Sequence, residues 1–307
     1  MAKEYDIVII GGGPAGLSAA LYAARSRRST LVIEKNVTGG QIALTAVIEN
    51  YPGIEEINGF DLGQAMQKQA EKYGAEMTYT KVTSIEPQEG QHIVRTEEGD
   101  YLAKAVIITA GADYNRLNIP GEERLTGYGV SYCATCDAAF FKDQKVAVVG
   151  GGDAAMDEGL FVTRYASSVD VIHRRDELRA SEVLQERAFA NEKMNFVWDT
   201  VVESIEGDKE VEFLRTRNQK TGQIRDVPVS AVFIFIGQTP NSGFLEGVVE
   251  MDPGGHIIVN EWMETNVPGI FAAGDVRNNS ARQVVSSAGD GATAAIRADH
   301  YISDHYK

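Results

Sequence analysis

Two glycine-rich turns, beginning at Gly11 and at Gly150, constrain the fold of this chain more than any other feature. Each turn follows a short apolar run and precedes an alanine-rich segment of helical composition, an order that predicts a strand, a tight turn and a helix. The two turns lie 139 residues apart. This repeat predicts two nucleotide-binding βαβ units in one chain.

The first unit has a predicted strand over 6–10, a helix over 17–24 and a second strand over 31–34. In such a turn the missing side chains let the backbone approach a pyrophosphate, and the helix N-terminus supplies unpaired N–H groups. Glu34 ends the second strand, where an acid accepts hydrogen bonds from ribose hydroxyls. The candidate pyrophosphate residues are Gly11, Gly13, Pro14, Ala15 and Gly16.

The second unit has predicted strands over 145–149 and 169–172 around a helix over 156–165. A basic cluster, rather than an acid, follows its second strand. Guanidinium groups bind a 2′-phosphate that a carboxylate would repel, so we expect this unit to prefer NADPH over NADH. The candidate residues are Gly150, Gly152, Asp153, Ala154, His173, Arg174, Arg175 and Arg179.

The two cysteines of the chain, Cys133 and Cys136, share one C-x-x-C motif. This spacing indicates either a metal site or a redox pair, with two inert buried thiols as the alternative. Structural zinc needs four ligands, and the five histidines are scattered, so we expect no metal site. The adjacent Asp137 is suited to deliver or accept the proton of thiol–disulfide exchange, or to cap the helix that follows.

The charge balance argues against some partners and locations. There are 29 Lys and Arg residues against 44 Asp and Glu residues, a net charge of -15, and such a surface repels nucleic acid. We find no run of 18 apolar residues, so no membrane span is expected. The N-terminus lacks a signal-peptide core, which makes the cytoplasm the expected compartment.

Breaks in the pattern divide the chain. Ala110-Gly111-Ala112 and Gly237-Gln238-Thr239-Pro240-Asn241 interrupt the strand-like runs, and we expect hinges near 112–118 and 237–242. Outside the two βαβ units, the pattern predicts strands over 82–95, 101–108, 201–217, 229–236 and 269–273 and a closing helix over 283–305.

Taken together, these motifs resemble those of the low-molecular-weight thioredoxin reductases, class II pyridine nucleotide-disulfide oxidoreductases, over essentially the whole chain. The resemblance implies an α/β fold of two Rossmann-like nucleotide-binding domains. The FAD domain is then discontinuous, over 1–113 and 242–307, and the NADPH domain, over 114–241, is inserted in it and carries the C-x-x-C. The matching elements are the first glycine turn with Glu34, Gly39-Gly40-Gln41, Glu49-Asn50-Tyr51-Pro52-Gly53, Cys-Ala-Thr-Cys-Asp, His-Arg-Arg with Arg179, Gly274-Asp275 and Arg282-Gln283.

The resemblance also implies individual roles. The first glycine turn holds the FAD pyrophosphate and Glu34 the adenosine ribose, while the three arginines hold the NADPH 2′-phosphate. Gln41 and Asn50 lie by the flavin, and Asp275 meets the ribityl chain. Further cofactor contacts are expected at Gly40, Val82, Gly111, Gly237, Gly274, Arg282, Gln283 and Val284.

For the reaction, the resemblance implies that NADPH reduces FAD and that FAD reduces the Cys133–Cys136 disulfide. The resulting dithiol then reduces the disulfide of thioredoxin. Cys136 faces the flavin, Cys133 attacks the partner disulfide, and Asp137 is the acid/base. A rotation of the inserted domain and a homodimer are expected as well.

One departure from the family pattern concerns the partner. The family usually continues Gly-Phe-Phe after the cysteine motif, whereas this chain has Ala138-Ala139-Phe140-Phe141 and lacks an aromatic residue at position 139. A glutaredoxin-like protein or a peroxiredoxin therefore stays open as the acceptor. Two further alternatives are an NADPH:ferredoxin or flavodoxin reductase with incidental cysteines, and an NADPH-binding sensor without flavin.

Overall fold

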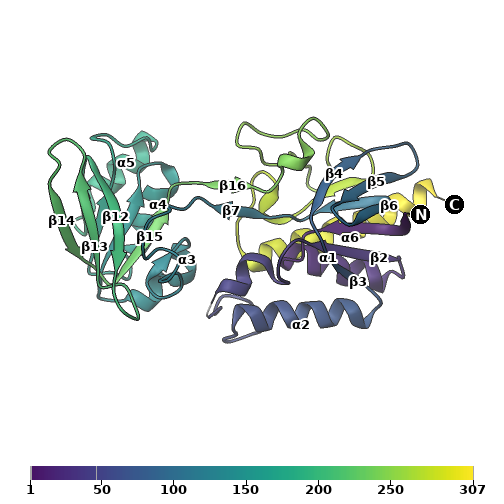
Figure 1. Cartoon of the computed structure of the whole chain (residues 1–307), viewed down its shortest axis with the longest axis horizontal. Helices are drawn as coiled ribbons and strands as arrows, with labels where there is room; N and C mark the ends of the chain where they lie inside the picture. The colour runs from purple at the N-terminus through teal and green to yellow at the C-terminus, as the bar shows by residue number, and fades with distance from the viewer. Residues whose placement is uncertain (1, 46, 307) are drawn as a thin grey trace. The chain divides into compact units, whose positions relative to one another are not determined.

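The computed structural model describes residues 2–45 and 47–306 of the chain. The chain divides into two compact units. The discontinuous unit runs from the N-terminus to Asp113 and from Thr239 to the C-terminus, and the inserted unit is Tyr114–Gln238. The chain passes from one unit to the other at two crossings, between 113 and 114 and between 238 and 239. Strands β7 (Ala112–Tyr114) and β16 (Gln238–Pro240) span these crossings and pair with each other (Figure 1).

The discontinuous unit is built on a seven-stranded sheet of order β3-β2-β1-β6-β5-β4, in which β17 also pairs with β6. Strands β1, β2, β3, β6 and β17 run parallel, and β5 and β4 continue the sheet as an antiparallel pair. The strands are β1 (Lys3–Ile10), β2 (Thr30–Glu34), β3 (Glu76–Tyr79), β4 (Val82–Glu86), β5 (His92–Thr96), β6 (Gly99–Ile108) and β17 (Ile270–Ala272).

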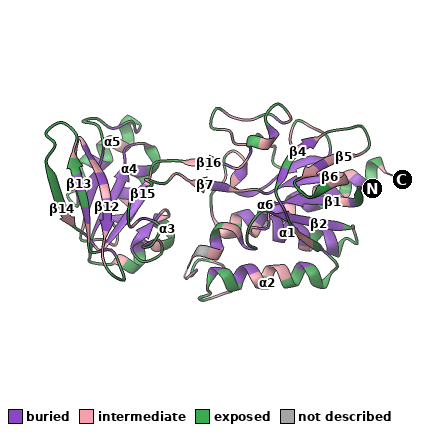
Figure 2. Ribbon diagram, viewed as in Figure 1, coloured by how far each residue is buried: buried purple, intermediate pink, exposed green. Residues whose placement is uncertain are grey.

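Apolar residues bury both faces of this sheet, as a parallel sheet requires. In β1, Ile7 and Ile9 face a core shared with α1 and α6, whereas Val8 and Ile10 face a second core. Figure 2 shows these strands buried and much of α2 exposed. The helices are α1 (Pro14–Arg25), α2 (Gly59–Lys72) and α6 (Val284–His305), with short 3-10 turns η1 (Gly40–Leu44), η3 (Gly243–Leu245) and η4 (Gly274–Val276).

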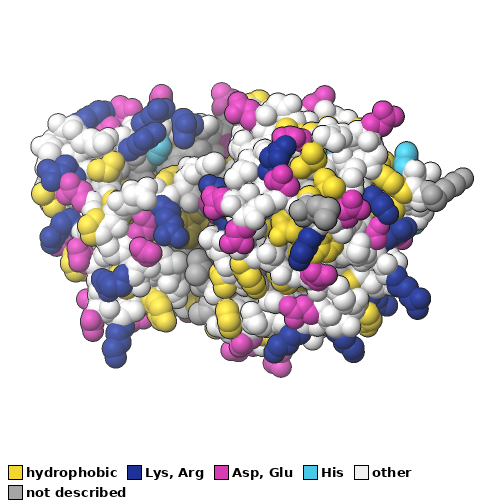
Figure 3. Space-filling model, turned by 45° about the vertical axis from the view of Figure 1, so that its right-hand side comes forward, with side chains coloured by type: hydrophobic (Ala, Val, Ile, Leu, Met, Phe, Trp, Pro, Cys, Tyr) yellow, Lys and Arg dark blue, Asp and Glu magenta, His cyan; other side chains and the backbone are white. Residues whose placement is uncertain are grey.

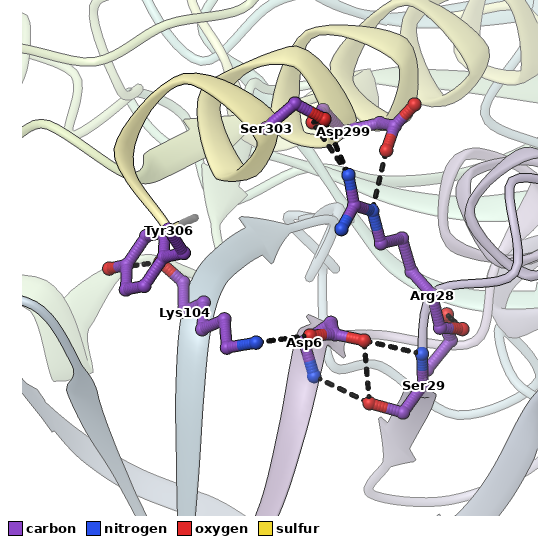
Figure 4. Close-up of polar contacts among 8 residues, drawn as sticks. Asp6, Arg28, Ser29, Lys104, Asp299, Ser303 and Tyr306 are labelled. Atoms are coloured by element: carbon purple, nitrogen blue, oxygen red, sulfur yellow. Dashed lines mark hydrogen bonds and ion pairs between the residues drawn. The ribbon is translucent and has the colours of Figure 1, made fainter.

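Polar contacts join the end of α6 to the segment before β2 and to β6 (Figure 4). The Arg28 guanidinium contacts the Asp299 carboxylate at 2.5 Å and donates to the Ser303 hydroxyl at 2.6 Å. The Tyr306 hydroxyl donates to the carbonyl of Lys104 at 3.3 Å. Across the described stretches, neither α6 nor any other helix is long and apolar enough to cross a membrane.

The inserted unit contains a five-stranded parallel sheet of order β11-β10-β9-β15-β8 and an antiparallel sheet of order β12-β13-β14. Its strands are β8 (Val130–Ser131), β9 (Lys145–Gly150), β10 (Ser168–Ile172), β11 (Met194–Val197), β12 (Thr200–Glu206), β13 (Phe213–Asn218), β14 (Ile224–Pro228) and β15 (Ala231–Phe235). Its helices are α3 (Ala134–Asp137), η2 (Ala138–Phe141), α4 (Asp153–Val162) and α5 (Glu182–Phe189).

The α/β fold class predicted from the sequence is confirmed, but several elements differ. Both turn-following helices begin three residues earlier than predicted, directly after Gly13 and Gly152. The stretches 82–95 and 201–217, each predicted as one strand, are hairpins. Gly90, with φ of 83°, and Gly207, with φ of 151°, take backbone conformations that reverse the chain between the paired strands.

Candidate functional site

The first glycine turn leads directly into α1. Gly13 precedes the helix, Pro14 is its first residue, and no side chain caps it. A Cβ on Gly16 would lie 1.9 Å from the Gly11 carbonyl oxygen, so that position excludes any larger residue. The close backbone packing and the uncapped helix N-terminus fit a bound pyrophosphate.

Glu34 lies at the end of β2 and is 6% exposed. One carboxylate oxygen accepts a hydrogen bond from the Gly12 amide at 2.6 Å, and the other accepts from the Asn36 amide at 2.8 Å. Each oxygen keeps a further lone pair. Glu34 therefore holds the glycine turn and still has capacity for ribose hydroxyls.

Residues from the C-terminal part of the chain join this turn. A Cβ on Gly274 would lie 2.9 Å from the Ala15 Cβ, which places the start of η4 beside α1. The adjacent Asp275 accepts hydrogen bonds from the hydroxyls of Ser280 at 2.9 Å and Ser287 at 3.3 Å. Burial raises the pKa of Asp275, and these hydrogen bonds oppose the rise.

Three other predicted residues of this unit, Gln41, Asn50 and Gln283, form side-chain hydrogen bonds. The Asn50 amide donates to the Gln283 side-chain oxygen at 3.2 Å, and the Gln41 amide donates to Asp113 at 2.7 Å. The remaining positions are Gly40, where a Cβ would lie 3.5 Å from the Gly13 Cα, Val82 as the first residue of β4, Gly111 with φ of 67°, Arg282 with φ of 55°, and Val284 as the first residue of α6.

The second glycine turn is joined to the loop that carries the arginines. The amide of Arg179 donates to the Gly151 carbonyl at 2.7 Å, and the amide of Ser181 donates to the Asp153 carboxylate at 2.6 Å. Gly152 precedes α4, and Ala154 lies in its first turn. Gly237 lies near the second crossing, where its carbonyl accepts from the Asn115 amide at 3.0 Å.

His173 fills the space beside this turn. Its ring lies 2.2 Å from where a Cβ on Gly151 would stand, and the residue is 5% exposed. Burial lowers the pKa of His173, and the positive charges of Arg179 and Arg174 lower it further, whereas hydrogen bonds with the backbone of Glu177 and Gly150 oppose this. Within 2–45 and 47–306, its Nε2 atom has no hydrogen-bond partner. An orphaned ring nitrogen beside a glycine turn fits a site for a polar ligand.

The side chains of Arg174, Arg175 and Arg179 are exposed at the carboxyl end of β10. None of the three forms an ion pair with any residue that the structure describes. Figure 3 shows Lys and Arg side chains gathered along one edge of the inserted unit. This concentration of positive charge suits a phosphate group.

Cys133 and Cys136 form a disulfide with an S–S distance of 2.11 Å. Cys133 immediately precedes α3, and Cys136 lies within it. Cys136 is exposed and Cys133 is half-buried. A disulfide that is open to solvent is accessible to an attacking thiolate.

Asp137 is the last residue of α3, where its amide donates to the Cys133 carbonyl at 3.2 Å. Burial raises the pKa of its carboxyl, and a hydrogen bond with the Ser131 side chain opposes the rise. The capping alternative is wrong, because the Asp137 side chain makes no cap bond to η2. A partly buried carboxyl with a raised pKa is suited to proton transfer.

Three residues around the disulfide were missed from the sequence. The Ser131 hydroxyl accepts from the Cys133 amide at 3.1 Å and donates to its carbonyl at 3.2 Å. The Tyr132 hydroxyl donates to Glu122 at 2.8 Å. Position next to the motif could have drawn attention to Ser131 and Tyr132, whereas nothing local marks Glu122.

Known proteins resemble the whole of this chain. A family model described as pyridine nucleotide-disulphide oxidoreductase matches residues 5–291. The chain is 46% identical to a thioredoxin reductase of Peptoclostridium litorale, covering 99% of each, and 46% identical to one of Bacillus subtilis (strain 168), covering 98% of this chain and 96% of the relative.

The solved thioredoxin reductase of Streptococcus pyogenes MGAS5005 has a TM-score of 0.96 to this chain at 47% identity, covering 99% of this chain and 100% of that one. The chain therefore belongs to the pyridine nucleotide-disulfide oxidoreductases and, within that class, to the thioredoxin reductase family. It is an oxidoreductase whose redox centre is the Cys133–Cys136 disulfide.

Proposed function

We propose that this chain is an NADPH-dependent thioredoxin-disulfide reductase that binds FAD in the discontinuous unit and NADPH in the inserted unit. The observation that carries the proposal is the exposed Cys133–Cys136 disulfide in the same unit as the arginine-bearing glycine turn. The acceptor follows from relatives that bear the name thioredoxin reductase and match the chain over almost its full length.

For FAD, we assign the pyrophosphate to the first glycine turn and the adenosine ribose to Glu34. The uncapped start of α1 and the spare lone pairs of Glu34 support this assignment. The packing of Gly274 against Ala15 brings Asp275 to the same region, which supports its contact with the ribityl chain. The other proposed contacts are Gly40, Gln41, Asn50, Val82, Gly111, Arg282, Gln283 and Val284.

For NADPH, we assign the pyrophosphate to Gly150, Gly152 and the start of α4, with Asp153 and Ala154. The three arginines, which form no ion pair within residues 2–45 and 47–306, take the 2′-phosphate. Nε2 of His173, which has no hydrogen-bond partner among the same residues, lies beside the same turn. Gly237 is proposed as a further contact. When bound, the two nucleotides supply hydride and electron-transfer chemistry that no side chain provides.

The reduced cysteine pair then performs thiol–disulfide exchange. The Cys133 thiolate attacks one sulfur of the partner disulfide, which breaks that S–S bond and forms a mixed disulfide. Asp137 in its protonated form donates a proton to the departing thiolate of the partner. The Cys136 thiolate attacks the Cys133 sulfur, which releases the reduced partner and forms the Cys133–Cys136 disulfide again. Two electrons pass from the pair to the partner.

Anaerobic titration with NADPH, followed by a count of free thiols, tests the proposal. We expect bleaching of a flavin band and two new thiols per chain, which then reduce oxidised thioredoxin. Bleaching without new thiols would favour a ferredoxin or flavodoxin reductase. A protein without flavin that cannot be reconstituted with FAD would favour a sensor.

A second acceptor is favoured by position 139. Ala139 is exposed beside Phe140, which is 47% exposed, and both follow the redox helix α3. A surface of this kind contacts a partner near the cysteines, so a different side chain at 139 changes which partner fits. Steady-state rates with oxidised thioredoxin, a glutaredoxin-like protein and a peroxiredoxin decide between them.

We also propose a cytoplasmic homodimer. The family resemblance supports the dimer, and the cytoplasm is the compartment expected from the sequence. Sedimentation equilibrium of the FAD-loaded protein tests the dimer, and fractionation of the source cells tests the compartment.

A further inference from the structure

The buried carboxylate of Glu122 is hydrogen-bonded to Tyr132, the residue that precedes the redox disulfide. Glu122 is 2% exposed, in the loop between β7 and β8. One of its oxygens accepts from the Leu117 amide at 2.9 Å and from the Tyr132 hydroxyl at 2.8 Å. The other accepts from the amides of Asn118 at 2.7 Å and Ile119 at 3.4 Å. Four donors on one buried carboxylate define a single side-chain geometry.

The loop that carries Glu122 packs against the backbone of β12. The Ile205 amide of β12 donates to the Pro120 carbonyl at 2.9 Å. Gly121 has φ of 88°, and a Cβ there would lie 1.8 Å from the Ile205 carbonyl oxygen. Because the turn packs backbone against backbone, it leaves little room for Glu122 to shift.

Tyr132 connects this carboxylate to the disulfide. It directly precedes Cys133, and its ring stacks on Tyr114, the first residue of the inserted unit, with centroids 5.3 Å apart. On the other side of Tyr132, Ser131 bonds both backbone groups of Cys133. The position of Cys133 is therefore fixed from the Glu122 side and from Ser131.

We infer that Glu122 is a positioning residue for thiol–disulfide exchange, acting through the Tyr132 hydroxyl on the backbone of Cys133. The inference rests on the proposed function, because exchange requires the sulfur atoms to meet at a defined distance and angle. A displacement of about 1 Å costs up to about a hundredfold in rate. Tyr132 also stacks on Tyr114, which lies at the first crossing. Through this stack, the disulfide moves together with the first crossing.

The test compares Tyr132→Phe and Glu122→Gln with the wild-type holoenzyme. Tyr132→Phe removes one hydroxyl and keeps the ring. Glu122→Gln places N–H groups against backbone donors, and Tyr128→Phe, at a tyrosine that is 62% exposed, is the matched control. The first measurement is the equilibrium of the reduced pair with oxidised glutathione, in which the pair closes and two molecules of reduced glutathione form.

We expect Tyr132→Phe to shift this equilibrium at least about threefold toward the open dithiol, because a less fixed Cys133 lowers the effective concentration of one thiol near the other. Turnover with the partner disulfide should fall about tenfold, while the KM for NADPH stays within about twofold. The control should match the wild type. Glu122→Gln should show the same pattern more strongly, and Tyr132→Phe decides alone if that variant does not fold.

An unchanged glutathione equilibrium in Tyr132→Phe would overturn the inference. A parallel loss of NADPH binding and exchange would also overturn it, because the contact would then only hold the fold. If the wild type closes with glutathione but reduces no partner protein, the proposed function fails. The equilibrium of the variants still decides the role of Glu122 in that case.

Discussion

The second strands of the two βαβ units end beside side chains of opposite charge. Glu34 ends β2, and Arg174 follows the histidine after β10. A carboxylate repels a 2′-phosphate and binds free ribose hydroxyls, whereas guanidinium groups bind the phosphate. This difference in charge supports the proposed assignment of FAD to the first unit and NADPH to the second.

Replacing both Arg174 and Arg175 by Ala should raise the KM for NADPH about a hundredfold, because each lost charged hydrogen bond costs about 1.5–3 kcal/mol. The KM for NADH should change less than about threefold, since NADH lacks the 2′-phosphate. Steady-state kinetics with both nucleotides measures this. Arg225→Ala, which changes an exposed arginine of β14, is the control; equal losses for NADPH and NADH would contradict the assignment.

If Asp137 is the proposed proton donor, Asp137→Asn should lower the rate of partner reduction about a hundredfold. Its effect on stability depends on pH. Burial raises the pKa of Asp137 in the folded protein, so its stabilising contribution is present at low pH and is lost as pH rises through the raised value. The variant should therefore gain thermal stability relative to wild type at pH 8 and lose that gain at pH 4; unfolding curves at both pH values, showing the reverse order, would refute this.

At the scale of elements, α6 and α1 approach each other through glycine. A Cβ on Gly291 would lie 1.9 Å from the Ala15 carbonyl oxygen, whereas Gly289, on the same helix, is exposed and has open space around it. Backbone contact of this kind allows no side chain between the helices. The pair offers a matched comparison within one helix.

Gly291→Ala should destabilise the protein by about 1–3 kcal/mol, because an added methyl group forces the two helices apart. Gly289→Ala should stabilise it by about 0.5–1 kcal/mol, since alanine favours the helix and meets no neighbour. Urea unfolding of the two variants measures both changes. A neutral effect of Gly291→Ala would show that α6 can move away from α1.

The sequence predicted those elements whose signals are local. Both glycine turns are short contiguous runs, and each lies between a strand and a helix as predicted. Helix α2 was not predicted, although the sequence carries a signal for its start. The Asn58 side chain caps this helix by accepting a hydrogen bond from the Phe60 amide at 2.9 Å. The contact between Glu122 and Tyr132 could not be predicted, since it joins residues ten positions apart that no local pattern connects.

At the scale of the whole molecule, the proposed reaction requires the inserted unit to move relative to the discontinuous unit. The proposed NADPH site and the disulfide belong to the inserted unit, and the proposed FAD site belongs to the other. If the inserted unit moves as one body, its NADPH site and its disulfide cannot both contact a single flavin at the same time. We therefore propose that the inserted unit rotates about the two crossings during each cycle.

Short amine-reactive cross-links between the two units should stop turnover with the partner disulfide. NADPH binding should persist, because its proposed residues all lie in one unit. Activity of the purified cross-linked protein, with mass spectrometry to select preparations linked within one chain, measures this. Full activity in chains linked between the units would rule out the rotation.

The order of synthesis adds a consequence to the discontinuous layout. The inserted unit is one continuous stretch, whereas β17 and α6 of the other unit are translated only after it. On the ribosome, the inserted unit can fold while the first βαβ unit still lacks the helix that covers α1. The nascent chain must therefore keep the apolar side of α1 from aggregating until residues 284–305 emerge, so this stretch of synthesis is where a chaperone would be needed most.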